Sequence, residues 1–175
     1  MTEQLTPFYR WLKSVFPDAV GSEFLDEEIA SGTLLRKLRH EDLTQLSFTD
    51  ASLDFILSFD VFEHISNYKD AMTECMRVLA PGGKLLFSVP FAPGVQDTII
   101  RAHIGPDGNV VHLMPPEYHG NPTRPSEGSL CFYHFGWDVL DTLRSAGASK
   151  ASVCTYYSYS LGNLGDDQML FIAER

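Results

Sequence analysis

The sequence predicts an α/β fold with a mostly parallel sheet, helices on both faces and an antiparallel strand at its end. Three features support this prediction. Strand-like runs alternate with helical patterns along the chain, and residues 53–59 form a near-continuous apolar run that suits a strand covered on both faces. The chain also closes with two further strand-like runs, at 149–157 and 168–173.

The composition indicates one soluble globular domain. The chain has 175 residues, 44% of them hydrophobic, and a formal net charge of −10. This charge argues against nucleic acid and against an anionic membrane as the main partner, and no apolar run is long enough to span a bilayer. The three cysteines are odd in number and widely spaced, and the N-terminus lacks the pattern of a signal peptide, so we expect a reduced, cytoplasmic protein.

The N-terminal third is expected to hold one helix and two strands. Residues 6–16 carry apolar side chains at helical spacing, Thr6 is a suitable N-cap and Pro7 suits the first helical position. Residues 19–24 resemble a short buried strand, and residues 34–39 a second strand.

The middle of the chain continues the alternation. After the strand at 53–59, residues 68–79 predict a helix that the Ala-Pro-Gly-Gly sequence at 80–83 should end, and residues 84–89 predict the next strand. From 91 to 135 the pattern dissolves into Pro, Gly and His, which is typical of a functional insertion or lid. Within it, 98–104 and 110–113 favour a hairpin around a turn at 105–108.

The last segment predicts a helix at 137–146, ended by Gly147, before the two terminal strands. The whole chain, 1–175, is therefore expected to be one domain with an insertion at about 91–135.

Acidic and polar residues follow several of these strands. In a parallel sheet the ligand lies beyond the carboxyl ends of the strands. Glu23 follows the first expected strand and could accept hydrogen bonds from both hydroxyls of a ribose, while Asp42 follows the second and could accept one from an exocyclic amine. Ser58 and Asp60 lie at the end of the third.

Five segments together resemble a known family. They are His-Glu-Asp-Leu at 40–43, Ser-Phe at 47–48, Asp-Ala-Ser-Leu-Asp at 50–54, Asp-Val-Phe-Glu-His at 60–64 and Arg-Val-Leu-Ala-Pro-Gly-Gly-Lys-Leu at 77–85. This combination is similar to the class I S-adenosylmethionine-dependent methyltransferases, in particular the type 11 subgroup.

The resemblance implies a Rossmann-like, seven-stranded sheet and S-adenosylmethionine as cofactor. By position, it implies that Glu23 binds the ribose hydroxyls and Asp42 the adenine amine, with Leu43 against the ring. Ser58 and Asp60 would line the methionine end of the site.

The chain departs from the family at its N-terminus. The family's first strand and glycine-rich loop would precede residue 6, where Gln4-Leu5-Thr6-Pro7 contains no glycine. The missing strand is normally central, so its neighbours would be left unpaired. We expect one of three arrangements: an N-terminally truncated chain, a sheet whose two edges close on each other, or a partner chain, such as a second copy in a homodimer, that covers the edge.

Two groups could carry further chemistry. Asp60, Glu63 and His64 lie within one helical turn and would suit a divalent metal, although the expected arrangement is metal-free. Among the histidines in or beside the insertion, His119 and His134 are candidate general bases, and the alternative is that they only pack the lid.

The sequence therefore predicts an S-adenosylmethionine-dependent methyltransferase that acts on a small-molecule or glycan-related acceptor. The alternative is a catalytically silent methyltransferase-like module that works through association. A nicotinamide dehydrogenase is disfavoured because no Gly-x-Gly-x-x-Gly follows a strand.

Overall fold

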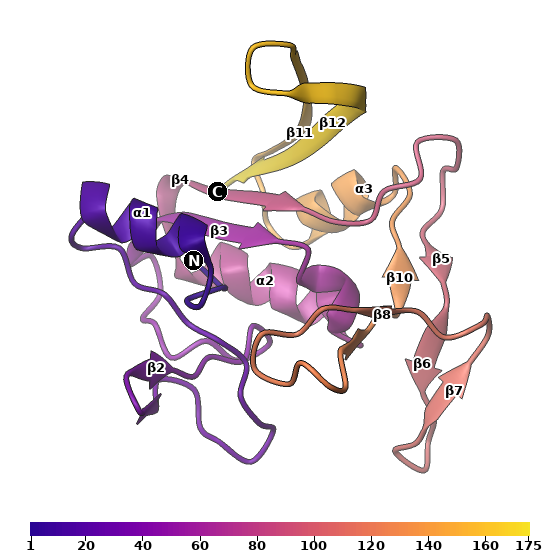
Figure 1. Cartoon of the computed structure of the whole chain (residues 1–175), viewed down its shortest axis with the longest axis horizontal. Helices are drawn as coiled ribbons and strands as arrows, with labels where there is room; N and C mark the ends of the chain where they lie inside the picture. Colours follow the sequence, from indigo (N-terminus) through magenta and orange to yellow (C-terminus); the bar gives the residue numbers. More distant parts are fainter.

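A curled mixed sheet forms the centre of the computed structural model, which describes residues 1–175 except the side chains of residues 166 and 167. Its four strands are ordered β11-β12-β4-β3 (Figure 1). They are β3 (Leu53–Phe59), β4 (Leu79–Ser88), β11 (Lys150–Ser158) and β12 (Asn163–Glu174). Since β3 is parallel to β4 and β12 is antiparallel to both β4 and β11, three strands run one way and the last runs against them. The α/β prediction with a terminal antiparallel strand is confirmed.

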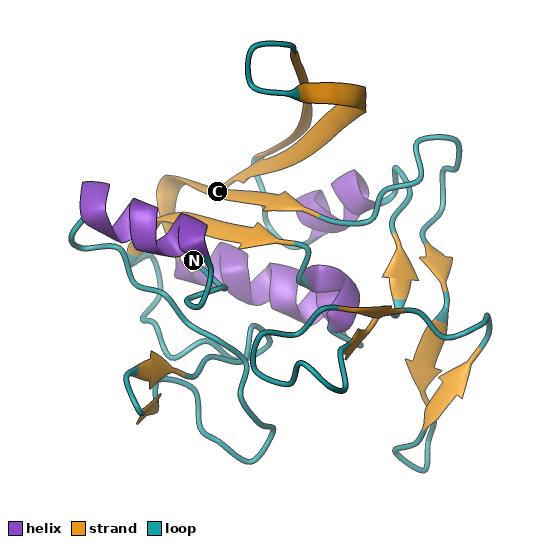
Figure 2. Cartoon of the chain, in the orientation of Figure 1, coloured by secondary structure: helices purple, strands orange, loops and turns teal.

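The helices lie on both faces of this sheet, as expected, although α1 buries none of its own residues. Figures 1 and 2 show α1 (Pro7–Val15) in front of the sheet, and α2 (Tyr68–Val78) and α3 (Val139–Ser145) behind it. The hydroxyl of Thr6 caps α1 by accepting the N–H of Tyr9, with Pro7 at the first position. Gly147, with φ of +108°, follows α3 at its C-terminal end.

The core lies between α2 and the sheet. The helix buries one apolar stripe, and β4 and β12 meet it with Leu85, Phe87 and Phe171. The rings of Phe87 and Phe171 stack with centroids 5.2 Å apart, which fixes the terminal strand β12 to the central strand β4.

The two strands expected in the N-terminal third are wrong. Residues 19–24 contribute only a single parallel bridge, between Glu23 and His40. Residues 34–39 form a hairpin of β1 (Leu34–Leu35) and β2 (Leu38–Arg39). Arg36 and Lys37 both have positive φ, and two left-handed residues in succession turn the chain back where a continuous strand was expected.

The first residues of the chain lie along the free edge of β3. The N–H of Thr2 donates to the carbonyl of Leu57 over 3.0 Å. On the side of residues 1–4 that faces away from β3, the N–H of Ser22 donates to the carbonyl of Met1 and the N–H of Gln4 donates to the carbonyl of Ser22, both over 3.0 Å. The two flanks are thus bridged by residues 1–4 and do not close directly on each other, and the sheet has four strands where the family pattern implied seven.

Residues 91–135 form three small antiparallel pairs instead of a part of the sheet. The hairpin of β6 (Ala102–Ile104) and β7 (Val110–His112) confirms the one expected there. The other two pairs are β5 (Ile99–Ile100) with β10 (Tyr133–His134), and β8 (Tyr118–His119) with β9 (Ser129–Leu130). In the part of the chain that the structure describes, no helix has the length and apolarity needed to cross a membrane.

Candidate functional site

A cavity of about 1610 Å³ lies beyond the carboxyl ends of the strands, between the N-terminal third and the 91–135 segment. That volume exceeds what one small ligand needs, so it can hold a cofactor and an acceptor together. Of the residues that sequence reasoning selected, Glu23, Asp42, Leu43, Asp60 and His119 line the cavity. The structure thus brings these five together from four separate segments.

Glu23 is held in place by the N-terminal segment. Its side chain is buried, and Oε1 accepts the backbone N–H of Leu5 over 2.7 Å. Burial raises the pKa of this carboxyl above its ordinary value. Each carboxylate oxygen has two lone pairs, so Glu23 keeps acceptor capacity for a diol after this bond.

Asp42 and Leu43 offer a polar and an apolar contact side by side. Oδ1 of Asp42 accepts both the backbone N–H and the hydroxyl of Thr44, at 2.8 and 2.7 Å, in a local turn that fixes the carboxylate. Leu43 is buried next to it. A flat heterocycle with an amino group could use both residues.

Asp60 is the first residue after β3 and has an unusual backbone. Its φ is +53°, in the left-handed region that non-glycine residues seldom adopt. Ser88, at the end of β4, holds it twice: the Ser88 hydroxyl donates to Oδ1 and the Ser88 carbonyl accepts the Asp60 N–H, each over 3.0 Å. The strained turn therefore fixes the Asp60 carboxylate at the carboxyl end of β3, beside the cavity.

Ser58 does not line the cavity, contrary to what the family pattern implied. It is fully buried, because residues alternate sides along β3 and Ser58 points into the protein, and its hydroxyl accepts that of Thr2 over 3.2 Å. Thr2 itself is a lining residue.

Glu3 is a site residue that sequence reasoning did not select. It lines the cavity, and its Oε2 accepts the backbone N–H of Phe59 over 2.9 Å. Burial raises its pKa, and the nearby charges of Glu23 and Asp60 add to the effect. The only sequence signal was its position 20 residues before Glu23, without the glycines that usually mark such a segment.

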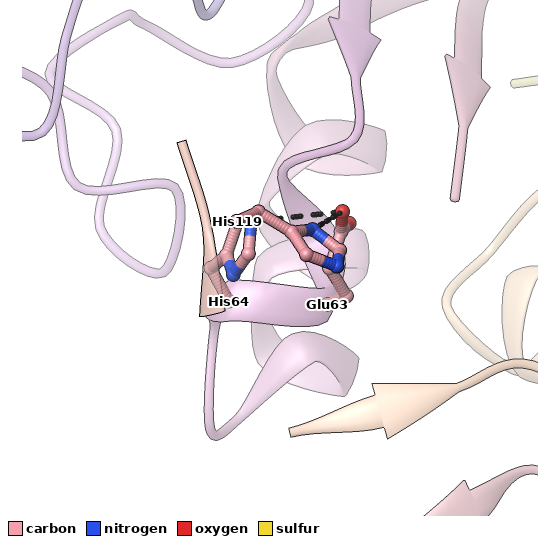
Figure 3. A group of neighbouring side chains, drawn as sticks. All are labelled: Glu63, His64 and His119. Atoms are coloured by element: carbon pink, nitrogen blue, oxygen red, sulfur yellow. Dashed lines mark ion pairs between the residues drawn. The ribbon is translucent and has the colours of Figure 1, made fainter. Parts of the chain in front are cut away.

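On the side of the 91–135 segment, Glu63, His64 and His119 form a cluster (Figure 3). Glu63 comes from the short helix η1 (Phe62–His64) and is fully buried. Nδ1 of His119 lies 3.4 Å and Nε2 of His64 lies 3.6 Å from Oε1 of Glu63. Burial raises the pKa of Glu63 to about 8.

The two histidines predicted as bases share one carboxylate. Oε1 of Glu117 lies 3.1 Å from Nε2 of His119 and 3.2 Å from Nε2 of His134, and Arg101 approaches Oε2 at 3.1 Å. Bonds from His119 and His134 lower the pKa of Glu117. Of the two, His119 reaches the cavity, while His134 lies behind Glu117.

The arrangement fits a cofactor that carries a ribose, an aromatic base and a positive charge. Glu23 supplies acceptors for a diol, Asp42 and Leu43 a place for the base, and Glu3 and Asp60 negative charge for a cation. Fold and site together are those of an α/β domain whose acidic cavity suits a cationic cofactor that carries a nucleoside.

Known proteins of one class share this sequence and fold. Residues 8–87 match the family model described as a methyltransferase domain. A "probable S-adenosylmethionine-dependent methyltransferase" from Mycolicibacterium smegmatis is 43% identical over 65 residues, 35% of this chain and 25% of that protein. A malonyl-acyl-carrier-protein O-methyltransferase 1 from Coxiella burnetii is 44% identical over 128 residues, 66% of this chain and 44% of that protein.

The fold is also similar to solved structures. An S-adenosylmethionine-dependent methyltransferase from Mesorhizobium loti superimposes with a TM-score of 0.56 at 17% identity, covering 97% of this chain and 86% of that one. Residues 8–87, just under half of the chain, thus match a methyltransferase domain, and these matches support a class I S-adenosylmethionine-dependent methyltransferase with S-adenosylmethionine as its cofactor. The matched part of the chain covers a quarter of the length of the Mycolicibacterium protein and less than half of the Coxiella protein.

Proposed function

We propose that this chain transfers a methyl group from S-adenosylmethionine to a small-molecule or glycan-related acceptor. One observation carries the proposal: Glu3, Glu23, Asp42 and Asp60 are among eight acidic residues that line a single cavity. Ionised acids that share one cavity repel each other, and a cationic ligand relieves this repulsion.

The roles proposed on the cofactor side are those that the family resemblance implies, for residues that line the cavity. Glu23 accepts the ribose hydroxyls, Asp42 accepts the adenine amine, and Leu43 packs against the ring. Asp60 faces the methionine end, with Glu3 adjacent. Ser58 acts indirectly, because its hydroxyl holds Thr2 against β3.

The acceptor side is formed by His119 and the residues that orient it. The cofactor supplies a methyl group already activated by the sulfonium, so the main task of the protein is to align the acceptor. His119 takes the proton from a hydroxyl acceptor. His134 positions the His119 imidazole through the Glu117 carboxylate that both histidines contact. The Coxiella relative is named as an O-methyltransferase, so oxygen acceptors are the first to test.

The other expectations about partners stay proposals of the same kind. We propose a cytoplasmic protein whose charge disfavours nucleic acid, with a homodimer as one way to cover the part of the β3 edge that residues 1–4 do not reach. A silent association module is not favoured, since the carboxylates of the cavity are all in place.

The test is the release of S-adenosylhomocysteine from S-adenosylmethionine, measured with a panel of hydroxyl- and carboxyl-bearing small molecules and sugars. We expect turnover with at least one acceptor, and loss of most of it in Asp60→Asn. The control is Glu28→Gln, at an exposed position outside the cavity. Acceptor-dependent turnover that is equal in wild type and Asp60→Asn would contradict the assigned role.

A further inference from the structure

Glu63 is a buried acid without a compensating hydrogen bond. Its side chain has no exposed surface, and among the described residues neither of its carboxylate oxygens has a hydrogen-bond partner. Burying an ionised carboxylate without hydrogen bonds costs several kcal/mol, by order of magnitude, unless a cation accompanies it. Among the described residues, the ion-pairing groups within 4.0 Å of Glu63 Oε1 are two imidazole nitrogens, and none is a lysine or an arginine.

Each of the two imidazoles is oriented by an acceptor on the ring nitrogen that faces away from Glu63. Nδ1 of His64 lies 2.8 Å from the carbonyl of Leu130, so this nitrogen must carry the proton and donate it. The lone pair of neutral His64 is then on Nε2, the atom that faces Glu63.

His119 repeats this arrangement. Its Nε2 donates to the Glu117 carboxylate over 3.1 Å, which leaves the lone pair of the neutral ring on Nδ1, again the atom that faces Glu63. A carbonyl or carboxylate behind each imidazole is what orients histidine ligands in metal sites.

The spacing of the three groups also suits an ion. Two ligand atoms at about 2.1 Å from a tetrahedral ion are about 3.4 Å apart. The distances from Glu63 Oε1 to His119 Nδ1 and His64 Nε2 are 3.4 and 3.6 Å, and the three ligand atoms lie within 4.8 Å of one another. A small movement of one imidazole would complete the site.

We propose that Glu63, His64 and His119 bind one divalent transition-metal ion at the wall of the cavity. Two imidazoles and one carboxylate are a ligand set suited to Zn²⁺ and its first-row neighbours, with a position left open. Because His64 and His119 line the cavity, that position faces it and can take an oxygen of the acceptor. Only this last step rests on the proposed function. In the metal-bound protein His119 is a ligand, so its role as a base applies to the metal-free protein.

A second cluster, Glu117, Cys131 and His134, is not the site. Glu117 already accepts two imidazole N–H groups and pairs with Arg101, so its charge is compensated. The Cys131 thiol is buried and donates to the carbonyl of Tyr133 over 3.2 Å. Cys131 therefore offers a variant that separates the two clusters.

The test is calorimetric titration of the chelator-treated chain with Zn²⁺, Mn²⁺ and Mg²⁺, together with the absorption spectrum of the Co²⁺-loaded chain. We expect one Zn²⁺ per chain, weak Mg²⁺ binding, and visible d–d bands with Co²⁺. Glu63→Gln and His119→Ala should each weaken Zn²⁺ by about 100-fold or more, a larger effect than is typical of outer-shell residues. His112→Ala, at an exposed strand position, and Cys131→Ser should bind as wild type does.

Binding of S-adenosylhomocysteine by each variant shows that it is folded and separates this proposal from the proposed function. Wild type that binds S-adenosylhomocysteine but no Zn²⁺ or Co²⁺ would overturn the metal site alone. Unchanged Zn²⁺ affinity in both Glu63→Gln and His119→Ala, or its loss in Cys131→Ser, would overturn it as well. If Glu63→Gln fails to fold, the Zn²⁺ affinity of His119→Ala and the Co²⁺ spectrum of wild type decide whether the metal site exists.

Discussion

The backbone N–H of Phe59 donates to Oε2 of Glu3 over 2.9 Å, which joins the start of the chain to the end of β3. The same short segment holds Glu23 through the N–H of Leu5. Residues 1–5 thus supply one carboxylate of the cavity, Glu3, and fix a second, Glu23, at the position where the family pattern implied a glycine-rich loop. This segment links the packing at the edge of the sheet to the cofactor site.

Replacement of Glu3 separates its hydrogen bond from its charge. Glu3→Ala removes the acceptor of a partly buried N–H, so we expect a loss of about 1 kcal/mol in the free energy of unfolding. Glu3→Gln keeps an oxygen acceptor and should restore most of that stability, yet still weaken S-adenosylmethionine binding. Urea denaturation and a binding titration measure the two effects. Equal stability of Glu3→Ala and wild type would contradict the account.

The pH dependence of the unliganded chain should report on Glu23. Its pKa is raised in the folded state, so its contribution to stability is complete below pH 4.5 and is lost as pH rises through the raised value. Glu23→Gln keeps an oxygen to accept from Leu5 and removes the charge. We therefore expect the stability of Glu23→Gln relative to wild type to increase from pH 4.5 to pH 7.5, measured by urea denaturation. A relative stability that falls over this range would show that the sign is wrong.

Arg77 should be more sensitive to a conservative change than other surface arginines. Its guanidinium donates to the carbonyls of Leu46 and Phe48 and to the carboxylate of Glu74, and it pairs with Asp50. Lysine cannot reproduce these bonds, so Arg77→Lys should cost about 1–2 kcal/mol of unfolding free energy.

Arg144→Lys is the matched control for Arg77→Lys, because among the described residues the guanidinium of Arg144 makes only an exposed pair with Asp141 one helical turn away. It should cost less than about 0.5 kcal/mol in the same thermal or urea unfolding experiment. Equal losses for the two variants would contradict the bridging role of Arg77.

The fold was predictable where local pattern and tertiary packing agree. The apolar run of β3, the stripe of α2 and the Gly-Pro-Asp-Gly turn between β6 and β7 each specify their element locally. The strand predicted at 19–24 was wrong because these residues have no neighbouring strand to pair with and make only one isolated bridge. Whether such a segment becomes a strand is decided by its neighbours, which a local pattern does not contain.

The candidate site was predictable only in part, for a similar reason. An α/β topology brings together the residues that follow the ends of its strands, or of extended segments in their place. Four predicted residues lie at such positions and line the cavity: Glu23, Asp42, Leu43 and Asp60. Glu3 and the contact between Glu63 and His119 depend on chain segments that are distant in sequence. No spacing rule marks contacts of that kind.

The most direct test of the account is calorimetric titration of the purified chain with S-adenosylmethionine and S-adenosylhomocysteine, for wild type and Glu23→Ala. Glu28→Ala, exposed and outside the cavity, is the control. The account predicts micromolar binding in wild type and the control, and loss of binding in Glu23→Ala. Equal affinity in wild type and Glu23→Ala, or no binding to wild type at millimolar cofactor, would contradict the cofactor site described here.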